Sequence, residues 1–186
     1  MPKSKAIVKI ENVVASATLN QKVDLNAVVK GYPGVEYRPE QFPGLVFRLK
    51  RPKTATLIFH SGKMVCTGAK SEKESRSAVM KVVKELKEGG IIIISKPELK
   101  IQNIVASASL GGTIDLEKAV SKLVKTMYEP EQFPGLIYRM DEPKVVILLF
   151  ASGKLVCTGA KKEQDVHDAV LKLHGILEEQ NLIFYD

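Results

Sequence analysis

Short apolar runs separated by stretches rich in Gly and Pro predict a β-sheet in the first part of the chain. Residues 6–19 and 45–50 are largely β-branched or apolar with polar residues interleaved, as is typical of strands. Residues 54–60 and 63–69 predict two more strands, joined at Ser61-Gly62 by a two-residue hairpin turn. Connections this short favour an antiparallel sheet.

Two helices are predicted beside these strands. Asp24 is placed to cap a short helix that begins at Leu25. Ser71 and Glu74 form a capping box, which opens a longer helix to about Glu88. One stripe of the longer helix is apolar and is expected to pack on the sheet; it contains Ala78, Val79, Val82, Val83 and Leu86.

The whole pattern occurs twice. Residues 39–45 return letter for letter at 130–136, and 32 of 61 positions are identical between 10–70 and 101–161. A repeat of this length is one structural unit built twice. We therefore expect two lobes with approximate two-fold symmetry.

The repeat predicts a first lobe over residues 1–95 and a second over 96–186. The second copy is expected to run from a strand over 91–104 to a helix near 163–179. Each lobe has about five strands and two helices, which is an α+β architecture with the long helix covering one face of the sheet.

The other face of each sheet is also expected to be apolar. Residues 145–150 read Val-Val-Ile-Leu-Leu-Phe, without the polar alternation of a solvated face. The second face is lined by Val14, Leu57, Phe59, Val65 and Thr67 in one lobe and by Val105, Leu148, Phe150, Val156 and Thr158 in the other. An open apolar face of this extent indicates a partner surface. A cover formed by another subunit is the alternative.

Polar and cationic residues flank this face. Asn12 and Asn103 place one amide in each lobe, and Arg48 and Arg139 alternate onto the face. Lysines lie at the strand ends: Lys63, Lys70, Lys154 and Lys161. An apolar floor with a cationic rim suits nucleic acid, with phosphates at the rim and base edges on the floor.

The net charge of the chain also favours nucleic acid, but it is distributed unevenly between the two lobes. The net charge is +7, with +9 in residues 1–95 and −2 in 96–186. A basic balance favours a polyanionic partner, although a merely solvated basic surface remains an alternative. The asymmetry indicates different partners for the two lobes.

Cys66 and Cys157 are repeat equivalents in predicted strands. They are expected to be buried free thiols, and a disulfide between the lobes is the alternative interpretation.

Several motifs in these repeats resemble the TATA-box-binding protein family. They are the doubled Glu-Gln-Phe-Pro-Gly-Leu, the Ile-x-Asn-x-Val strand and the Ser-Gly-Lys-x-Val-x-Thr-Gly-Ala-Lys hairpin, and together they cover nearly the whole chain. The resemblance implies a saddle with a ten-stranded curved antiparallel sheet and helices on the convex face. It also implies a general transcription factor that binds and kinks the minor groove of TATA-box DNA.

The resemblance implies a role for each of the residues that line or flank the second face. Phe42 with Phe59, and Phe133 with Phe150, would wedge between base steps at the two ends of the site. Asn12 and Asn103 would donate to minor-groove acceptors, with Thr67 and Thr158 beside them. The van der Waals floor would be Val14, Leu57, Val65, Val105, Leu148 and Val156. Phosphates would be neutralised by Arg48, Lys63, Lys70, Arg139, Lys154 and Lys161.

Further partners are implied by the same resemblance. Glu129 and Glu131 occupy the loop that binds a transcription factor B-type protein in the family, and RNA polymerase would be recruited indirectly. The equivalent first-lobe residues are Arg38 and Glu40, so only the second loop carries an acidic pair. The short start at Met1 looks like the archaeal branch, which implies a cytoplasmic, nucleoid-associated protein, or a nuclear one if eukaryotic.

Other chemistries find little support in the residues. Ser61-Gly62-Lys63 lacks the upstream Gly of a phosphate loop, and no nucleophile–base constellation or metal-ligand spacing stands out, so neither an enzyme nor a cofactor or metal is predicted. Two other functions stay open. One is a single-stranded nucleic-acid binder that stacks bases on the same phenylalanines. The other is a structural homodimer that buries the open face. Dimerisation of the DNA-free protein through the same face is a separate expectation.

Overall fold

The computed structural model describes residues 5–186, which divide into two compact units. We call Asn12–Gln102 the first-repeat unit, and residues up to Glu11 together with Asn103–Asp186 the second-repeat unit. The boundary falls inside two long strands, β1 (Ile7–Thr18) and β5 (Glu98–Ser109), so each unit contains part of both. The compact units are defined by contacts in space and do not test the predicted boundary between the two sequence repeats, after residue 95. That boundary stays a prediction.

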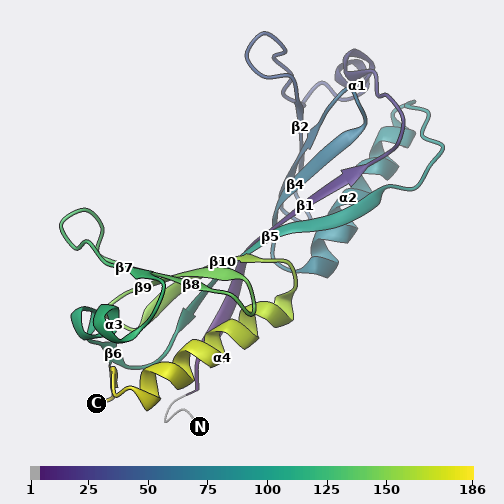
Figure 1. Cartoon of the computed structure of the whole chain (residues 1–186). Helices are drawn as coiled ribbons and strands as arrows, with labels where there is room; N and C mark the ends of the chain where they lie inside the picture. The colour runs from purple at the N-terminus through teal and green to yellow at the C-terminus, as the bar shows by residue number, and fades with distance from the viewer. Residues whose placement is uncertain (1–4) are drawn as a thin grey trace. The chain divides into compact units, whose positions relative to one another are not determined.

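The first-repeat unit is an antiparallel sheet with one long helix (Figure 1). Its strand order is β2-β3-β4-β1, and each neighbouring pair is antiparallel. The elements are α1 (Leu25–Gly31), β2 (Leu45–Leu49), β3 (Thr54–Ile58), β4 (Lys63–Ala69) and α2 (Glu72–Glu88).

The second-repeat unit follows the same plan, with strand order β5-β10-β9-β8-β7. A separate two-stranded sheet pairs β11 with β6. The elements are β6 (Thr113–Ile114), α3 (Leu116–Lys122), β7 (Thr126–Met127), β8 (Leu136–Met140), β9 (Val145–Leu149), β10 (Lys154–Ala160), α4 (Glu163–Glu179) and β11 (Ile183–Phe184).

The α+β class and the antiparallel pairing are confirmed, but the main sheet has nine strands within residues 5–186 rather than the ten predicted. The missing strand is the first-repeat counterpart of β7. The extended piece around Tyr37 forms only a single bridge, between Glu36 and Val46. Glycines and prolines on both sides leave too short a segment for a ladder.

The helix caps formed as predicted in the first-repeat unit. Asp24 Oδ1 accepts a hydrogen bond from the Ala27 N–H at 3.2 Å, and Ser71 Oγ accepts one from the Glu74 N–H at 2.9 Å. These contacts satisfy N–H groups that have no partner inside the helix. At α4 the N-cap residue is Lys162, whose side chain makes no capping hydrogen bond.

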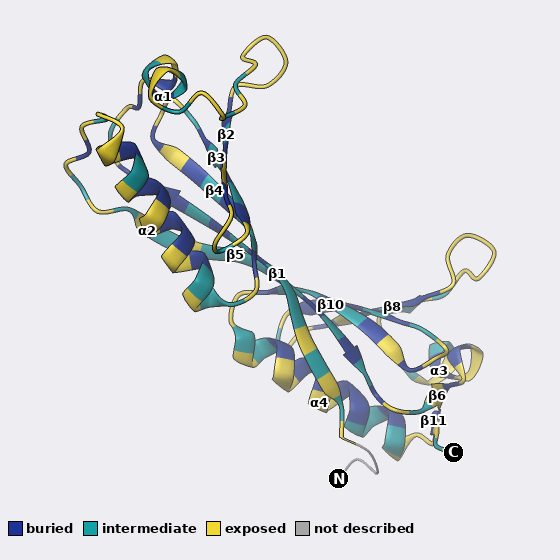
Figure 2. Ribbon diagram, turned by 180° about the vertical axis from the view of Figure 1, so that it is seen from behind, coloured by how far each residue is buried: buried dark blue, intermediate teal, exposed yellow. Residues whose placement is uncertain are grey.

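Each long helix buries one stripe against its sheet (Figure 2). In the first-repeat unit, the stripe of α2 joins Leu45, Phe47, Ile58, Met64 and Cys66 in one apolar core. Along β2, β3 and β4, buried residues alternate with partly exposed ones. The side of each sheet that faces away from its long helix is therefore not sealed by the unit's own helices.

Two local predictions were wrong. β3 ends at Ile58, so Phe59 begins a four-residue turn closed by the Gly62 N–H to Phe59 O bond, in place of a two-residue hairpin. The second repeat's first strand begins at Glu98, not at residue 91. Ile92 and Ile94 are 82% and 89% exposed. This segment does not pair with a strand because the Gln21 side chain binds Ile92 O and the Ile94 N–H at 2.7 and 3.0 Å.

Cys66 and Cys157 are free and buried, as predicted. Burial raises the pKa of the Cys157 thiol to about 11, so the thiolate form is strongly disfavoured. Within residues 5–186, no helix is long and apolar enough to cross a membrane.

Candidate nucleic-acid interface

We call the side of each sheet that faces away from its long helix the open face. In the first-repeat unit, β-ladder partners place Ser16, Val65, Leu57 and Val46 in one row across it. The equivalent row of the second-repeat unit is Ser107, Val156, Leu148 and Ile137. All of these side chains are partly exposed, whereas their neighbours along each strand are buried. The fold therefore leaves apolar side chains in contact with solvent in both units.

An aromatic pair lies beside each row. The Phe42 and Phe59 rings are 5.8 Å apart, centroid to centroid, and 72° to one another. Phe133 and Phe150 repeat the arrangement at 5.9 Å and 69°. Phe42 and Phe133 are 43% and 38% exposed, although edge-to-face packing holds each ring in place. Both pairs are the ones that the resemblance to the TATA-box-binding protein family implied.

Each pair depends on a glycine in the loop that carries its first ring. A Cβ on Gly44 would lie 2.7 Å from Phe42 Cε1 and 3.0 Å from Phe59 Cε1. At Gly135 the distances to Phe133 and Phe150 would be 2.8 and 3.0 Å. The glycine of the repeated Phe-Pro-Gly motif thus makes room for both rings, a role that the sequence alone did not show.

A β-bulge positions the amide of each unit. The pairing of β1 with β4 shifts between Val13 and Ala15, and the bulged Gly68 has φ +100°. Its N–H donates to Asn12 Oδ1 at 2.7 Å, which leaves Asn12 Nδ2 as the donor directed elsewhere.

The second-repeat unit contains the same device at Gly159, whose φ is +102°. The Gly159 N–H donates to Asn103 Oδ1 at 2.7 Å, and Asn103 Nδ2 lies 3.2 Å from Thr158 Oγ1. The predicted Asn103 and Thr158 are therefore in direct contact on the open face.

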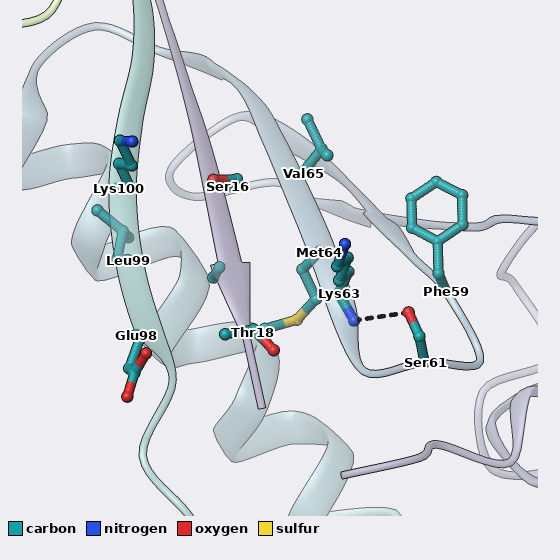
Figure 3. A pocket seen from close by; sticks show the side chains of 11 residues that line it. Ser16, Thr18, Phe59, Ser61, Lys63, Met64, Val65, Glu98, Leu99 and Lys100 are labelled. Carbon is teal, nitrogen blue, oxygen red and sulfur yellow. Dashed lines mark hydrogen bonds between the residues drawn. The ribbon is translucent and has the colours of Figure 1, made fainter. Parts of the chain in front are cut away.

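A groove runs along the open face of each unit. The first-repeat groove has a volume of about 870 Å³; Figure 3 shows Phe59, Lys63 and Val65 along one side, with Glu98 and Lys100 across β1 from them. The second-repeat groove, of about 600 Å³, is lined by Phe150, Lys154, Val156, Ser107 and Lys9, among others. Each groove thus combines an aromatic ring, aliphatic floor and lysine ammonium groups.

The two predicted arginines differ in their surroundings. Arg48 Nη2 lies 3.6 Å from Glu36 Oε2, with both side chains well exposed. Arg139 has Met127 at the position equivalent to Glu36. It lines a hollow of about 600 Å³ that also contains Lys125, Lys144 and Lys161.

Asp141 belongs to this second hollow. The Lys125 ammonium donates a hydrogen bond to Asp141 and lowers the pKa of its carboxyl group. The carboxylate therefore stays charged and partly offsets the surrounding cations.

All predicted nucleic-acid-contacting side chains are at least partly exposed. Apart from the exposed Phe42 and Phe133, the uncharged residues of the set are partly buried: Asn12, Val14, Leu57, Phe59, Val65, Thr67, Asn103, Val105, Leu148, Phe150, Val156 and Thr158. The cations Arg48, Lys63, Lys70, Arg139, Lys154 and Lys161 are exposed, as are Glu129 and Glu131 in their loop. Sequence reasoning missed Val46, Ile137, Ser16 and Ser107, although two-residue alternation from Arg48, Arg139, Val14 and Val105 would have found them.

The described residues contain no group of three or more His, Cys, Asp or Glu side chains that could hold a metal ion. The groove linings likewise lack a set of ligands for an ion, since their charged groups are mainly lysines. The chemistry available at the open face is therefore apolar contact, stacking, hydrogen bonding and attraction of anions.

Comparison with known proteins identifies relatives over nearly the whole chain. The family model described as transcription factor TFIID, or TATA-binding protein, matches twice, at residues 7–89 and 98–180. The TATA-box-binding protein of Sulfolobus acidocaldarius is 56% identical over 179 residues, covering 96% of this chain and 91% of that protein. That of Pyrodictium occultum is 55% identical, covering 96% and 90%. The solved structure of Methanococcus jannaschii TBP superposes with a TM-score of 0.84 at 52% identity, covering 92% of this chain and 98% of that one.

Proposed function

The chain belongs to the transcription factor TFIID, or TATA-binding protein, family, and from that premise we propose that it is a general transcription initiation factor that binds A·T-rich promoter DNA. The observation that carries the proposal is the open apolar face with an exposed aromatic pair in each unit. Each unit contacts one half of the DNA site through the minor groove. The proposal assigns no catalytic reaction and no cofactor.

The aromatic pairs supply the kink. Insertion of an apolar side chain between base steps partly unstacks them and bends the duplex, a mechanism for which TATA-binding proteins are a standard example. Phe42 and Phe133 are the exposed rings, and Phe59 and Phe150 support them from the open face. Each exposed ring is already packed against its partner ring, in the room that the glycine leaves. It therefore loses little conformational entropy when it inserts between bases.

The bulge amides supply base discrimination. The minor groove of an A·T pair presents only acceptors, whereas a G·C pair adds the guanine amino donor. The Oδ1 atoms of Asn12 and Asn103 accept from Gly68 and Gly159, so their Nδ2 groups are the donors on this face. Asn103 Nδ2 donates one hydrogen to Thr158 Oγ1 and keeps its second hydrogen for DNA. Donors backed by aliphatic side chains fit A·T pairs and disfavour the guanine amino group.

A dye-labelled duplex tests the proposal. Energy transfer between dyes at the two ends of a short T·A-rich duplex should rise on binding, and affinity should fall steeply with salt as Lys and Arg displace counterions. Tighter binding to single strands would favour the stacking alternative. A salt-insensitive dimer that does not bind DNA would favour a structural homodimer.

The aromatic pairs give a first prediction. Phe42→Ala and Phe133→Ala should each weaken duplex binding by about 1–3 kcal/mol, the scale of one lost stacking contact, and each should lower energy transfer at saturation. Tyr32→Ala serves as the control, because Tyr32 packs edge-on against the core residue Phe47 rather than on the open face. Full bending by both phenylalanine variants would contradict the wedge role.

We further propose that Glu129 and Glu131 bind a transcription factor B-type protein, which links this chain to RNA polymerase. Both side chains are exposed in the loop before Phe133, and the first-repeat loop carries Arg38 where this loop has Glu129. The second-repeat loop is therefore the more acidic of the two and suits a basic partner.

Charge reversal gives a second prediction. Glu129→Arg should weaken formation of the ternary complex by about tenfold or more, as like charges meet at the contact, while leaving binary DNA binding unchanged in a gel-shift titration. The matched control is Glu40→Arg, at the position equivalent to Glu131 in the first-repeat loop. Parallel losses of binary and ternary binding by Glu129→Arg would count against the role.

A further inference from the structure

Each groove is lined by a serine, Ser16 or Ser107, and the hydrogen bonds of these two equivalent serines to their side-chain partners run in opposite directions. In the first-repeat unit, Gln102 Nε2 donates to Ser16 Oγ at 2.7 Å. In the second-repeat unit, Ser107 Oγ donates to Glu11 Oε1 at 2.7 Å. Glu11 and Gln102 are repeat equivalents, as are Ser16 and Ser107. One amide-to-carboxylate difference therefore reverses the direction of the hydrogen bond to the serine.

This reversal changes what each serine offers to a ligand. A hydroxyl has one hydrogen to donate and two lone pairs that accept. Ser16 accepts from the Gln102 amide, so its own hydrogen can be donated outward. Ser107 donates its hydrogen to the Glu11 carboxylate, so it presents lone pairs alone. Ser16 is thus a donor toward its groove, and Ser107 an acceptor.

Both serines lie where DNA is proposed to bind. Ser16 lines the first-repeat groove with Phe59 and Lys63 (Figure 3). Ser107 lines the second-repeat groove with Phe150 and Lys154. Each hydroxyl therefore faces the same space as the apolar floor.

We propose that Glu11 and Ser107 make the second-repeat groove accept the guanine amino group, whereas Gln102 and Ser16 make the first-repeat groove select A·T pairs. Guanine N2–H₂ is the one donor in the minor groove, and adenine N3 and thymine O2 are acceptors. The two half-sites are then read differently, and an asymmetric promoter is bound in one preferred orientation. This inference rests on the proposed function and deepens it.

Net charge does not account for the same asymmetry. Each groove is lined by two lysines, Lys63 and Lys100 in the first-repeat unit and Lys9 and Lys154 in the second. Each also has one carboxylate: Glu98 lines the first-repeat groove, and Glu11 is hydrogen-bonded to Ser107 of the second. Glu98 is exposed at the groove edge, and its repeat equivalent is Ile7. Glu11 differs because its carboxylate contacts a serine of the floor, with Lys9 Nζ 4.0 Å away. Glu98→Gln is therefore a matched control for charge.

The test uses duplexes in which single A·T pairs are replaced in turn by G·C or by inosine·C, which lacks the amino group. At the position facing Ser107, the wild type should bind guanine about three- to tenfold more tightly than inosine, the scale of one hydrogen bond. Glu11→Gln should abolish that preference, because Ser107 then becomes a donor. Ser107→Ala should abolish it too.

The exchange variant gives the sharpest result. The double variant Glu11→Gln/Gln102→Glu should move the guanine preference to the other half-site and reverse the preferred orientation, measured by cleavage from a probe on one unit. Glu98→Gln should alter overall affinity and leave base preference unchanged. The inference is overturned if guanine and inosine bind equally at every position, or if Glu11→Gln retains the preference.

The outcomes separate this inference from the proposed function. A wild type that bends T·A-rich duplex but shows no guanine preference refutes the role of Glu11 alone. A wild type that does not bend or prefer such duplexes refutes the proposed function itself.

Discussion

The two units share an open face but differ in their cores. The first-repeat unit buries three hydroxyl groups, those of Thr54, Thr56 and Ser75. The second-repeat unit has Val145, Ile147 and Val166 at the equivalent positions, all buried. The open-face residues, by contrast, are nearly the same in both repeats, including the phenylalanines and the bulge asparagines. Identity between repeats therefore marks the surface proposed to bind DNA, while the supporting core has diverged.

The buried hydroxyls should make the first-repeat unit the less stable one. Thr56 Oγ1 and Ser75 Oγ have no hydrogen-bond partner within the described part of the chain. Cys66, which faces Thr56 across the sheet, is only a weak hydrogen-bonding group. A buried polar group without a partner costs about 1–3 kcal/mol.

The largest expected effect in this comparison comes from removing those hydroxyls. Thr56→Val combined with Ser75→Ala should raise the free energy of unfolding of residues 12–102 by about 1–3 kcal/mol. Hydrogen exchange should slow in that unit and stay unchanged elsewhere. The reverse change in the other unit, Ile147→Thr, is the control and should destabilise. Faster exchange in the double variant would show that the hydroxyls are satisfied in solution.

A second difference is a buried histidine. His174 lies in the core of the second-repeat unit, at the position equivalent to Val83. Its Nε2 lies 2.8 Å from the Tyr185 hydroxyl, which donates to Glu178, so Nε2 carries the hydrogen. Nδ1 is then buried with no partner among the described residues. Protonation would add a charge and a donor in this apolar setting.

This histidine predicts a pH dependence confined to one unit. Burial lowers the pKa of His174 below its ordinary 6.5, although Glu178 acts in the opposite direction. The unfolded chain thus binds the proton more readily, and stability is full above about pH 6.5 and falls below it, by at most about 1.4 kcal/mol per pH unit. Urea unfolding at pH 7.5 and 5.5 should show a larger loss for the wild type than for His174→Val. Equal losses would exclude this linkage.

Features fixed by near neighbours in the chain were predictable from the sequence. The bounds of α2 follow from the Ser71 cap and from one continuous apolar stripe. The open face followed from strand alternation and the repeat, whereas the pairing of the phenylalanines was implied by the resemblance to the TATA-box-binding protein family. The strand predicted for residues 91–97 is absent, because Gln21, more than 70 residues away in the chain, binds their backbone and holds them out of the sheet. The opposed serine hydrogen bonds likewise depend on contacts between distant strands, which no local pattern encodes.

The smallest expected effect concerns the arginines of the rim. Arg48 pairs with Glu36, whereas Arg139 has Met127 at the equivalent position. Glu36→Gln should tighten duplex binding, because Arg48 then loses its ion-pair partner and can bind a phosphate. The expected gain is about two- to threefold, since an exposed ion pair contributes less than about 1 kcal/mol. The converse change, Met127→Glu, should weaken binding to a similar extent by engaging Arg139.

The salt dependence of binding distinguishes a new contact between Arg48 and a phosphate from a general change in net charge. If Arg48 meets a phosphate only after Glu36 is removed, the slope of log affinity against log salt should steepen by about 0.9 in Glu36→Gln, the value for one further phosphate contact. Removal of a distant carboxylate, as in Glu88→Gln at the end of α2, should raise affinity without that change in slope. An unchanged slope in Glu36→Gln would mean that Arg48 already contacts DNA despite its partner, and the two rims would then be equivalent.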